Sequence, residues 1–584
     1  MIFLEWLKNK QPPIYYELVR SGYPRVTSMC LAKAGCQSLD DAIDLLENEE
    51  LLDPALIDHI EDASDLIFDF INKKKTICIF GDYDADGVTS SAILKTALSA
   101  LGAKVLVRLP DRFTEGYGIS IKAIDEMLGK GTELFITVDN GIRALNEVKY
   151  AQEHGAKVII LDHHEPGDEI PNADVTIDLK CKGTKFPDSH LTGAGLAYKV
   201  ACYLLDKKNK SYIAYQLSDL AAIGTIADVE ILLGENRRIV KKALELMHSD
   251  DYSRGGILGL YDDIKHITAE DIAFSIAPCL NAPGRLSENG ANLPFKMLIE
   301  DDYNKAVELA MECKSVNRKR KEIQKACRDI IYKQAQEQIE KGNKVLVIIS
   351  DDAGIGIVGL LAGNLKEEFN RPTIVFGYKD TPNGKILTGS ARSIEEYSMI
   401  EELEKAQKNL NCFLGFGGHR LAAGMSCKNA EDVEKLRDFL NSNCMLTDKD
   451  LERKIRFDLD IREADVNDVL FDEMDRLEPF GVGFPKPVFR MKVDLISKYN
   501  KLYDTCGTTN EYLKLFAEDF SLMGFGLVKR YEEENTPRQI TVIGQPSQNF
   551  FKGKTYNQFA FEDYIAEDIS TTPLLEELKK GGIA

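Results

Sequence analysis

Five short apolar runs alternate with helical patterns between residues 75 and 228 of the chain. Most of these runs are continuous, which is typical of strands that are buried on both faces of a parallel sheet. Apolar residues at helical spacing fill the intervals, so the pattern predicts a doubly wound α/β domain. The predicted strands are Thr76–Phe80, Lys104–Leu109, Leu134–Val138, Lys157–Leu161 and Val175–Leu179.

The spacing of apolar residues also predicts how the rest of the chain is divided into domains. A proline-free helical pattern joins two α/β patterns, and short alternating strands with several aromatic residues come last. This last module fits an OB-fold, which binds single strands by stacking, or a docking domain without that role. The predicted order is an N-terminal helical cap (1–72), a first α/β domain (73–301), a connecting helix (302–341), a smaller α/β domain (342–446), an OB-like β-domain (450–568) and a tail (569–584).

The turn Gly81–Gly87, directly after the first predicted strand, is unusually acidic. It places Asp82, Asp84 and Asp86 at alternate positions between two glycines. Three like charges so close together repel one another, and a bound cation is the usual relief. The turn is therefore a candidate for half of a metal site.

Other potential metal ligands follow other predicted strands. Asp139 comes after the third strand, and His163 and His164 come after the fourth. Asp228 follows a predicted helical stretch further along the chain. Ligands bind beyond the carboxyl ends of the strands in such sheets, so we expect these side chains to converge. Carboxylates with one or two imidazoles suit Mn²⁺ or Mg²⁺, and two such ions sharing a carboxylate suit hydrolysis of phosphate esters.

Composition and charge narrow the classes of protein and partner. No apolar run approaches the ~18 residues of a membrane span. The 12 cysteines form no C-x-x-C pair, which argues against a zinc ribbon, and the start lacks the features of a signal peptide. We therefore expect a cytoplasmic protein without a membrane span. The formal net charge of −21 argues against binding of a polyanion by the whole surface, so any nucleic acid must be held by local basic patches and cations.

The acidic and histidine segments resemble the four motifs of the DHH phosphoesterase superfamily. These segments are Gly81–Gly87, Val138–Gly141, Leu161–His164 and Gly224–Asp228. Their order and spacing resemble the RecJ-like exonucleases, and Phe416–Gly424 resembles the signature of the DHH-associated domain. The resemblance covers about residues 70–490. It implies a DHH domain, a connecting helix, a DHH-associated domain and a single-strand-specific DNA exonuclease that works 5′ to 3′ in repair or recombination and releases 5′-mononucleotides.

The resemblance also implies roles for the acidic and histidine residues. One ion would be held by Asp84 and Asp139, and the other by Asp86, Asp139, His163 and Asp228. His164 would face the scissile phosphate, and Asp82 would support or join the first ion. Some members of the superfamily have a histidine just before the acidic turn, where this chain has Phe80.

Basic and small residues are the expected substrate contacts, because guanidinium groups bind phosphate bidentately. By the resemblance they are Arg112, Arg285, Ser390, Arg392, Gly418 and His419. Ser390 and Arg392 would hold the 5′ phosphate, and Arg318 and Arg320 on the connecting helix are candidates for further backbone contacts. Cys279 and Phe484 stand where the resemblance leads us to expect an arginine and an asparagine. For Arg112, a surface salt bridge is the alternative.

Two other functions are compatible with the same motifs. One is a DHH phosphodiesterase that acts on short oligonucleotides or cyclic dinucleotides, and the other is a non-catalytic replication or repair scaffold. For the exonuclease, the expected partners are single-stranded DNA and a single-strand-binding protein or a helicase, and the expected state is a monomer.

Overall fold

The structure, a computed structural model, describes residues 5–381, 384–498, 500–507, 510–551 and 554–567. The chain forms two compact units. Among the described residues, Glu49–Arg453 form the first unit, whereas residues 5–48 join those from Lys454 onward in the second. No helix among the described residues is long and apolar enough to cross a membrane.

A five-stranded parallel sheet forms the centre of the first α/β domain, with the strand order β3-β2-β4-β5-β6. Its strands are β2 (Thr76–Phe80), β3 (Lys104–Arg108), β4 (Thr132–Val138), β5 (Lys157–Asp162) and β6 (Val175–Asp178). The five predicted strands and the doubly wound arrangement are confirmed. The chain winds away from β2 and β4 in opposite directions, so the loops after these neighbouring strands meet at the switch point of the sheet.

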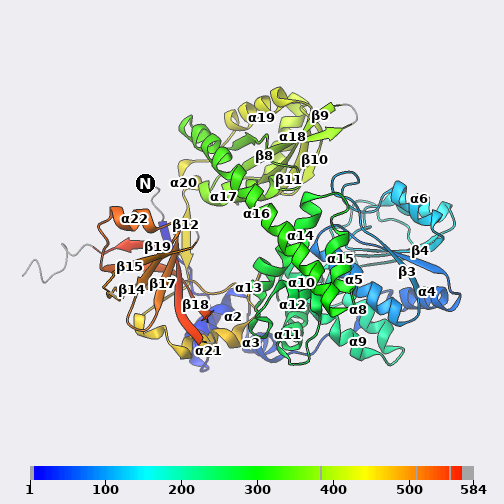
Figure 1. Ribbon diagram of the computed structural model, residues 1–584, viewed down its shortest axis with the longest axis horizontal. Helices are drawn as coiled ribbons and strands as arrows, with labels where there is room; N and C mark the ends of the chain where they lie inside the picture. The colour runs from blue at the N-terminus through cyan, green and yellow to red at the C-terminus, as the bar shows by residue number, and fades with distance from the viewer. Residues whose placement is uncertain (1–4, 382–383, 499, 508–509, 552–553, 568–584) are drawn as a thin grey trace, which may run out of the picture. The chain divides into compact units, whose positions relative to one another are not determined.

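Helices cover both faces of this sheet (Figure 1). On one face, the main apolar core is built by α4 (Ile60–Asn72), α5 (Ala85–Ala100), α8 (Gly193–Asp206) and α10 (Ser218–Ala227). On the other face lie α6 (Ile121–Gly129) and α7 (Leu145–Glu153). Helix α5 begins inside the acidic turn, because the Asp84 side chain caps it by accepting a hydrogen bond from the Gly87 N–H at 3.1 Å.

Further helices complete the domain and anchor α10. They are α9 (Ser211–Gln216), α11 (Gly234–His248), α12 (Gly255–Leu260), α13 (Ala269–Asp271), α14 (Ala277–Leu286) and α15 (Asn292–Ile299). Asp219, buried at the start of α10, accepts hydrogen bonds from Arg254 Nε at 2.5 Å and from the Tyr252 hydroxyl at 2.9 Å. Because these contacts fix one end of α10, they also position Asp228 at its other end.

Helix α16 (Tyr303–Glu340) confirms the predicted connecting helix and leads into the second α/β domain. That domain has a mixed sheet of order β10-β11-β9-β8-β7, in which only the β7–β8 pair is parallel among the described strands. The strands are β7 (Leu346–Ile349), β8 (Thr373–Thr381), β9 (Gly384–Arg392), β10 (Phe413–Gly418) and β11 (Ala422–Cys427). The helices around it are α17 (Val358–Phe369), α18 (Met399–Leu410) and α19 (Ala430–Ser442).

The second unit contains a seven-stranded sheet of order β13-β14-β18-β19-β17-β16-β15. Its strands are β13 (Leu459–Ile461), β14 (Phe489–Asp494), β15 (Tyr503–Cys506), β16 (Tyr512–Phe516), β17 (Ser521–Phe525), β18 (Gln539–Phe551) and β19 (Lys554–Ala566). Two helices, α21 (Asp468–Leu477) and α22 (Val528–Glu533), interrupt the strands. The predicted β-rich module is confirmed, while the tail (569–584) lies outside the described residues.

The segment predicted as one N-terminal helical cap, residues 1–72, is divided between the two units. In the second unit, β1 (Glu5–Lys8) pairs in parallel with β12 (Lys454–Phe457), followed by α1 (Pro13–Arg20), α2 (Arg25–Lys33) and α3 (Leu39–Glu47). Trp6 packs against the small core of Ile455, Phe457 and Ile543, and its indole N–H donates to Asp563 at 2.8 Å. The correction has a physical cause: a short strand with one large apolar residue is stabilised by pairing with a distant strand, which helical periodicity does not reveal.

Candidate functional site

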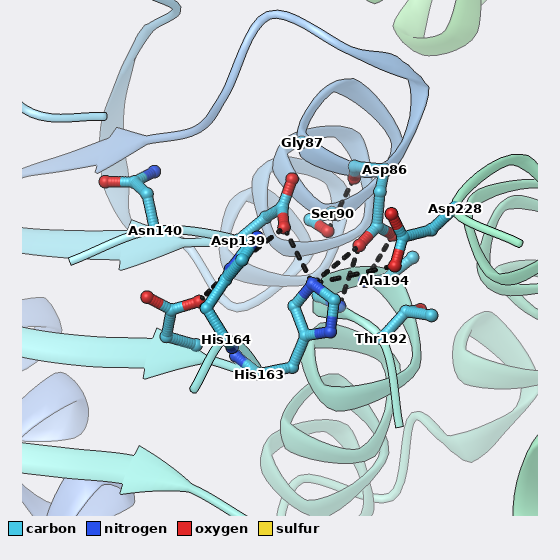
Figure 2. A network of polar contacts seen from close by, with 12 residues as sticks. Asp86, Gly87, Ser90, Asp139, Asn140, His163, His164, Thr192, Ala194 and Asp228 are labelled. Carbon is cyan, nitrogen blue, oxygen red and sulfur yellow. Dashed lines mark hydrogen bonds and ion pairs between the residues drawn. The ribbon is translucent and has the colours of Figure 1, made fainter. Parts of the chain in front are cut away.

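The predicted acidic and imidazole residues converge at the carboxyl ends of β2, β4 and β5 (Figure 2). Asp139 follows β4 with a left-handed backbone (φ 60°), which turns its carboxylate toward the acidic turn after β2. His163 Nε2 lies 3.0 Å from Asp139 Oδ1, 3.6 Å from Asp86 Oδ2 and 3.8 Å from Asp228 Oδ2. One imidazole nitrogen therefore faces three carboxylates from three different elements.

Asp86 is held by the start of α8. Its carboxylate oxygens accept hydrogen bonds from the backbone N–H groups of Gly193 and Ala194, both at 2.8 Å. Both glycines beside it are required by close packing, because a Cβ on Gly193 would lie 2.9 Å from Asp86 Oδ2 and a Cβ on Gly224 would lie 2.6 Å from Asp86 Oδ1. The sequence analysis missed the two N–H donors and Gly193, although the glycine-rich start of α8 was a visible signal.

Three overlapping groups of side chains have the composition and spacing of metal sites. Asp82, Asp84 and Asp139 form the first group, Asp86, His163 and Asp228 form the second, and Asp139, His163 and His164 form the third, with ligand atoms within 4.8 Å of one another in each. Asp139 also contacts His163 of the second group, so it lies where a bridging ligand would. Asp82, expected only to support or join the first ion, belongs to the first group by geometry.

The buried polar atoms show that this donor set fits cations. Both carboxylate oxygens of Asp82 lack a hydrogen-bond partner of good geometry among the described residues, although the backbone N–H groups of Tyr83 and Gly118 lie close enough to lower its pKa. Burial nevertheless raises the pKa of Asp82 well above its usual range, and the charge of Asp84 adds to this. A divalent cation would supply the missing partner.

The pKa values of the other candidate metal residues also indicate that the site suits a bound cation. Burial and the charge of Asp84 raise the pKa of Asp86 to about 7, and burial and the charge of Asp86 raise the pKa of Asp228 to about 8. Burial raises the pKa of Asp139 well above its usual range and lowers that of His163 to about 3. The imidazole is therefore neutral at pH 7 and able to bind a metal, while the carboxylates repel one another until a cation neutralises them.

His164 lies beside this centre and is held by two residues that the sequence analysis missed. Its Nδ1 is 2.8 Å from Asp162 Oδ1, and the Tyr117 hydroxyl lies 3.1 Å from the ring and donates to the Asp139 carbonyl at 2.9 Å. Burial lowers the pKa of His164, but its hydrogen bond with Asp162 and the charge of that carboxylate outweigh this and raise the pKa. The position of Asp162, directly before the histidine pair at a strand end, was the available signal.

A cavity of about 570 Å³ opens over the carboxyl ends of β4, β5 and β6. His163, His164 and Asp228 line it, and so does His419 from the β10–β11 turn of the second α/β domain. Gly418 precedes His419, and a Cβ there would lie 2.4 Å from the Ala422 carbonyl oxygen. The glycine is thus required by the hairpin that presents His419.

The predicted arginines gather near the acidic turn. Arg112 lies over the Tyr83 ring at 5.0 Å, Arg285 Nη1 donates to the Gly356 carbonyl at 3.3 Å, and Arg392 Nη1 donates to Ser390 Oγ at 3.2 Å. None of the three arginines forms an ion pair with a described carboxylate. Burial, followed by the positive charges of Arg112 and Arg320, lowers the pKa of Arg285 to about 10. Half-buried cations without carboxylate partners form a site for an anion.

The chain matches three families along its length. The DHH family, N-terminal domain, matches residues 76–225, the DHHA1 domain matches residues 342–445, and the RecJ OB domain matches residues 457–563. The single-stranded-DNA-specific exonuclease RecJ of Haemophilus influenzae is 30% identical over 542 residues, which are 88% of this chain and 92% of that protein. This chain belongs to the RecJ family.

Two further RecJ proteins are similar to this chain, one in sequence and one in both sequence and fold. The single-stranded-DNA-specific exonuclease RecJ of Bacillus subtilis is 34% identical over 557 residues, which are 92% of this chain and 68% of that protein. The crystal structure of RecJ from Thermus thermophilus in complex with Mn²⁺ is 25% identical in sequence and has a TM-score of 0.78. That match covers 97% of this chain and 80% of the other, so the RecJ fold extends through both units.

Three departures that the sequence analysis noted within this RecJ chain are apolar packing positions. Phe80 is fully buried in the core on the α6–α7 face of the sheet, away from the ligands. Cys279 is buried and accepts a hydrogen bond from Asn317 Nδ2 at 3.3 Å. Phe484 is buried and stacks on Phe480 with ring centroids 5.7 Å apart. None of the three side chains is an exposed polar group that would contact a nucleic acid.

Proposed function

We propose that this protein is a metal-dependent exonuclease that hydrolyses single-stranded DNA from its 5′ end and releases 5′-mononucleotides. The observation that carries the proposal is the pairing of two ligand groups around Asp139 with a cluster of arginines that have no carboxylate partners among the described residues. The relatives named single-stranded-DNA-specific exonucleases support the same substrate.

The two ligand groups would hold two Mn²⁺ or Mg²⁺ ions, with Asp82, Asp84 and Asp139 at one and Asp86, Asp139, His163 and Asp228 at the other. Bound there, the ions supply a water of lowered pKa and positive charge for the reacting phosphate. The protein's part is to hold these carboxylates in place, which the α8 N–H groups and the α5 cap do at Asp86 and Asp84.

His164 is the residue proposed to contact the scissile phosphate. Asp162 accepts a hydrogen bond from Nδ1, which keeps a proton on that nitrogen and fixes the orientation of the ring. The raised pKa of His164 favours the imidazolium, which can donate to a phosphate oxygen as negative charge develops there. The Tyr117 hydroxyl also contacts this ring, at 3.1 Å from Nδ1.

Ser390, Arg392 and Arg112 are proposed to bind the terminal 5′ phosphate, with Arg285 at the following phosphate. The positive charge of Arg112 lowers the pKa of both Arg392 and Arg285. If these side chains bind the terminal phosphate close to the metal groups, the first phosphodiester bond of the strand would be the one that is hydrolysed. Gly418 and His419 are proposed to bind the substrate in the cavity beside His164.

We also propose that the enzyme acts as a monomer in DNA repair or recombination, together with a single-strand-binding protein or a helicase. Its cytoplasmic location stays a prediction. The OB domain in the second unit is proposed to bind the strand beyond the reacting end by stacking, as OB-folds do.

Digestion of end-labelled DNA tests this function. The substrates are a long 5′-phosphorylated single strand labelled at either end, the same strand as a duplex, a dinucleotide and a cyclic dinucleotide, each with Mn²⁺ or Mg²⁺. We expect a 5′ label to be released at once as a mononucleotide, only from the single strand, and no release by Asp139→Asn. Preference for the dinucleotides would favour a short-oligonucleotide phosphodiesterase, and no hydrolysis of any substrate would favour a scaffold.

A further inference from the structure

Val229, directly after the candidate ligand Asp228, has a backbone conformation that valine rarely adopts. Helix α10 ends at Ala227, and Val229 follows with φ 62°. In this left-handed region Cβ lies too close to the following carbonyl oxygen, and a branched side chain adds to the crowding. Where α17 and α18 end, the left-handed residues are asparagines, Asn370 (φ 46°) and Asn411 (φ 49°), which tolerate this conformation better.

Side-chain packing does not explain why a valine stands at this position. Val229 is 67% exposed, so burial of its side chain does not compensate for the cost of its backbone conformation. Its N–H donates to the Ile226 carbonyl at 3.2 Å, a hydrogen bond that any residue except proline could make. Backbone strain that is not offset by packing is found mainly at functional sites.

Asp228 is also the most weakly held residue of the second candidate metal group (Figure 2). Its side chain is 31% exposed, compared with 2% for Asp86 and 6% for His163. Two backbone N–H groups donate to Asp86, whereas none of the described residues donates a hydrogen bond to the Asp228 carboxylate. Its contact with His163 Nε2 is long, at 3.8 Å. The protein alone therefore does little to keep this carboxylate in the group.

The chain is held in place on both sides of the turn that contains Val229. Before the turn, Asp219 and its partners fix the start of α10. After the turn, Glu230 Oε1 lies 3.6 Å from His190 Nδ1, and Oε2 lies 3.8 Å from Lys180 Nζ. A change of the backbone at Val229 would therefore be confined to the turn, where it would reorient the ligand that precedes it.

We propose that Asp228 is a releasable ligand of the second metal group, and that Val229 is the positioning residue that makes its release easy. In the ion-free protein, repulsion from Asp86 and the cost of the left-handed backbone both favour an arrangement in which Asp228 has turned away. A bound cation favours the arrangement in which Asp228 is a ligand. The inference rests on the proposed metal-dependent function and adds that Val229 weakens binding of the second ion, because only part of the ion-free protein is ready to bind it.

The variants Val229→Asn and Val229→Ile form a matched pair, because asparagine tolerates the left-handed region whereas isoleucine keeps the branched side chain. A Mn²⁺ titration followed by electron paramagnetic resonance reports the second ion, since an exchange-coupled signal requires both ions. We expect Val229→Asn to give this signal at about tenfold lower Mn²⁺ concentration, because more of the ion-free protein would hold Asp228 in the ligating position. Val229→Ile should need the same concentration as the wild-type protein.

Lys74→Asn separates this effect from a general gain in stability. Lys74 is exposed and left-handed (φ 55°), but it precedes β2, whereas the candidate ligands follow the ends of the strands. This variant should leave Mn²⁺ binding unchanged. The same Mn²⁺ requirement in Val229→Asn and wild type, or an equal shift in Lys74→Asn or Val229→Ile, would overturn the inference. Wild-type protein that binds no Mn²⁺, or never shows the coupled signal, would instead overturn the proposed two-ion site, so the two failures are distinguishable.

Discussion

At the scale of single residues, the site is defined by buried carboxylates that repel one another. The sequence analysis named every residue that the structure brings into the candidate metal groups, because three aspartates in one short turn and a histidine pair at a strand end are rare patterns. It assigned no role to Asp162, Tyr117 or the N–H groups of Gly193 and Ala194. Their roles depend on which loops meet in space, and each residue alone is an ordinary turn or helix-start residue.

The pKa shifts predict how the metal-free protein responds to pH. Asp86, Asp178 and Asp228 have pKa values raised to about 7, 7 and 8, chiefly by burial, and that of His164 is raised as well. Groups with raised pKa values bind more protons in the folded state, so their contribution to stability is lost as pH rises. His163, with its lowered pKa, acts in the opposite direction only below about pH 6.5.

We therefore expect the free energy of unfolding, measured by urea denaturation in EDTA, to fall between about pH 6.5 and 8. Mn²⁺ should weaken this dependence, because ions held by Asp86 and Asp228 would keep these two carboxylates ionised, whereas Asp178 and His164 would still titrate. A free energy of unfolding that rises over the same interval in EDTA would contradict the assigned environment of these carboxylates.

At the scale of elements, the strand ends and the close packing of α5, α8 and α10 determine the site. The predicted strands of the parallel sheet were right because strands buried on both faces give continuous apolar runs. Individual strands of the β-rich module are harder to recognise in the sequence, because some combine apolar residues with many polar ones, as β19 (Lys554–Ala566) does. Strand β1 was missed because its partner β12 is distant in sequence.

Gly224 on α10 tests the importance of this packing. In Gly224→Ala, the new Cβ would lie 2.4 Å from Ala194 Cβ and 2.6 Å from Asp86 Oδ1, so α10 must shift and carry Asp228 with it. We expect a loss of stability of about 1–3 kcal/mol and weaker Mn²⁺ binding by calorimetry.

Gly363→Ala is the matched control, since Gly363 lies inside α17 and its Cβ would meet nothing within 4 Å. There the same substitution should stabilise the protein by about 0.5–1 kcal/mol through helix propensity, with unchanged Mn²⁺ affinity. Similar effects of the two substitutions would mean that contact with Asp86 does not decide the outcome.

At the scale of the whole molecule, the two units divide the chain's functions. The first contains the candidate metal groups and the predicted substrate arginines, and the second contains the OB domain and residues 5–48. Apolar patterning predicted the order of these modules, but it could not predict that β1 and the first three helices join the C-terminal strands.

The one tryptophan of the chain, Trp6, lies in the second unit. Its fluorescence should therefore report unfolding of that unit, whereas circular dichroism reports both. We expect Mn²⁺ to raise the melting temperature of a transition seen by circular dichroism and to leave the tryptophan transition unchanged, since a ligand stabilises what binds it. An equal shift of both signals would show that the two units unfold together.

The most direct test of the central claim, that two metal ions share Asp139, is a Mn²⁺ titration followed by electron paramagnetic resonance. We expect two Mn²⁺ ions per chain with the spectrum of an exchange-coupled pair, and loss of that coupling in Asp139→Asn. A single bound ion, or two ions whose spectra show no coupling in the wild-type protein, would contradict it.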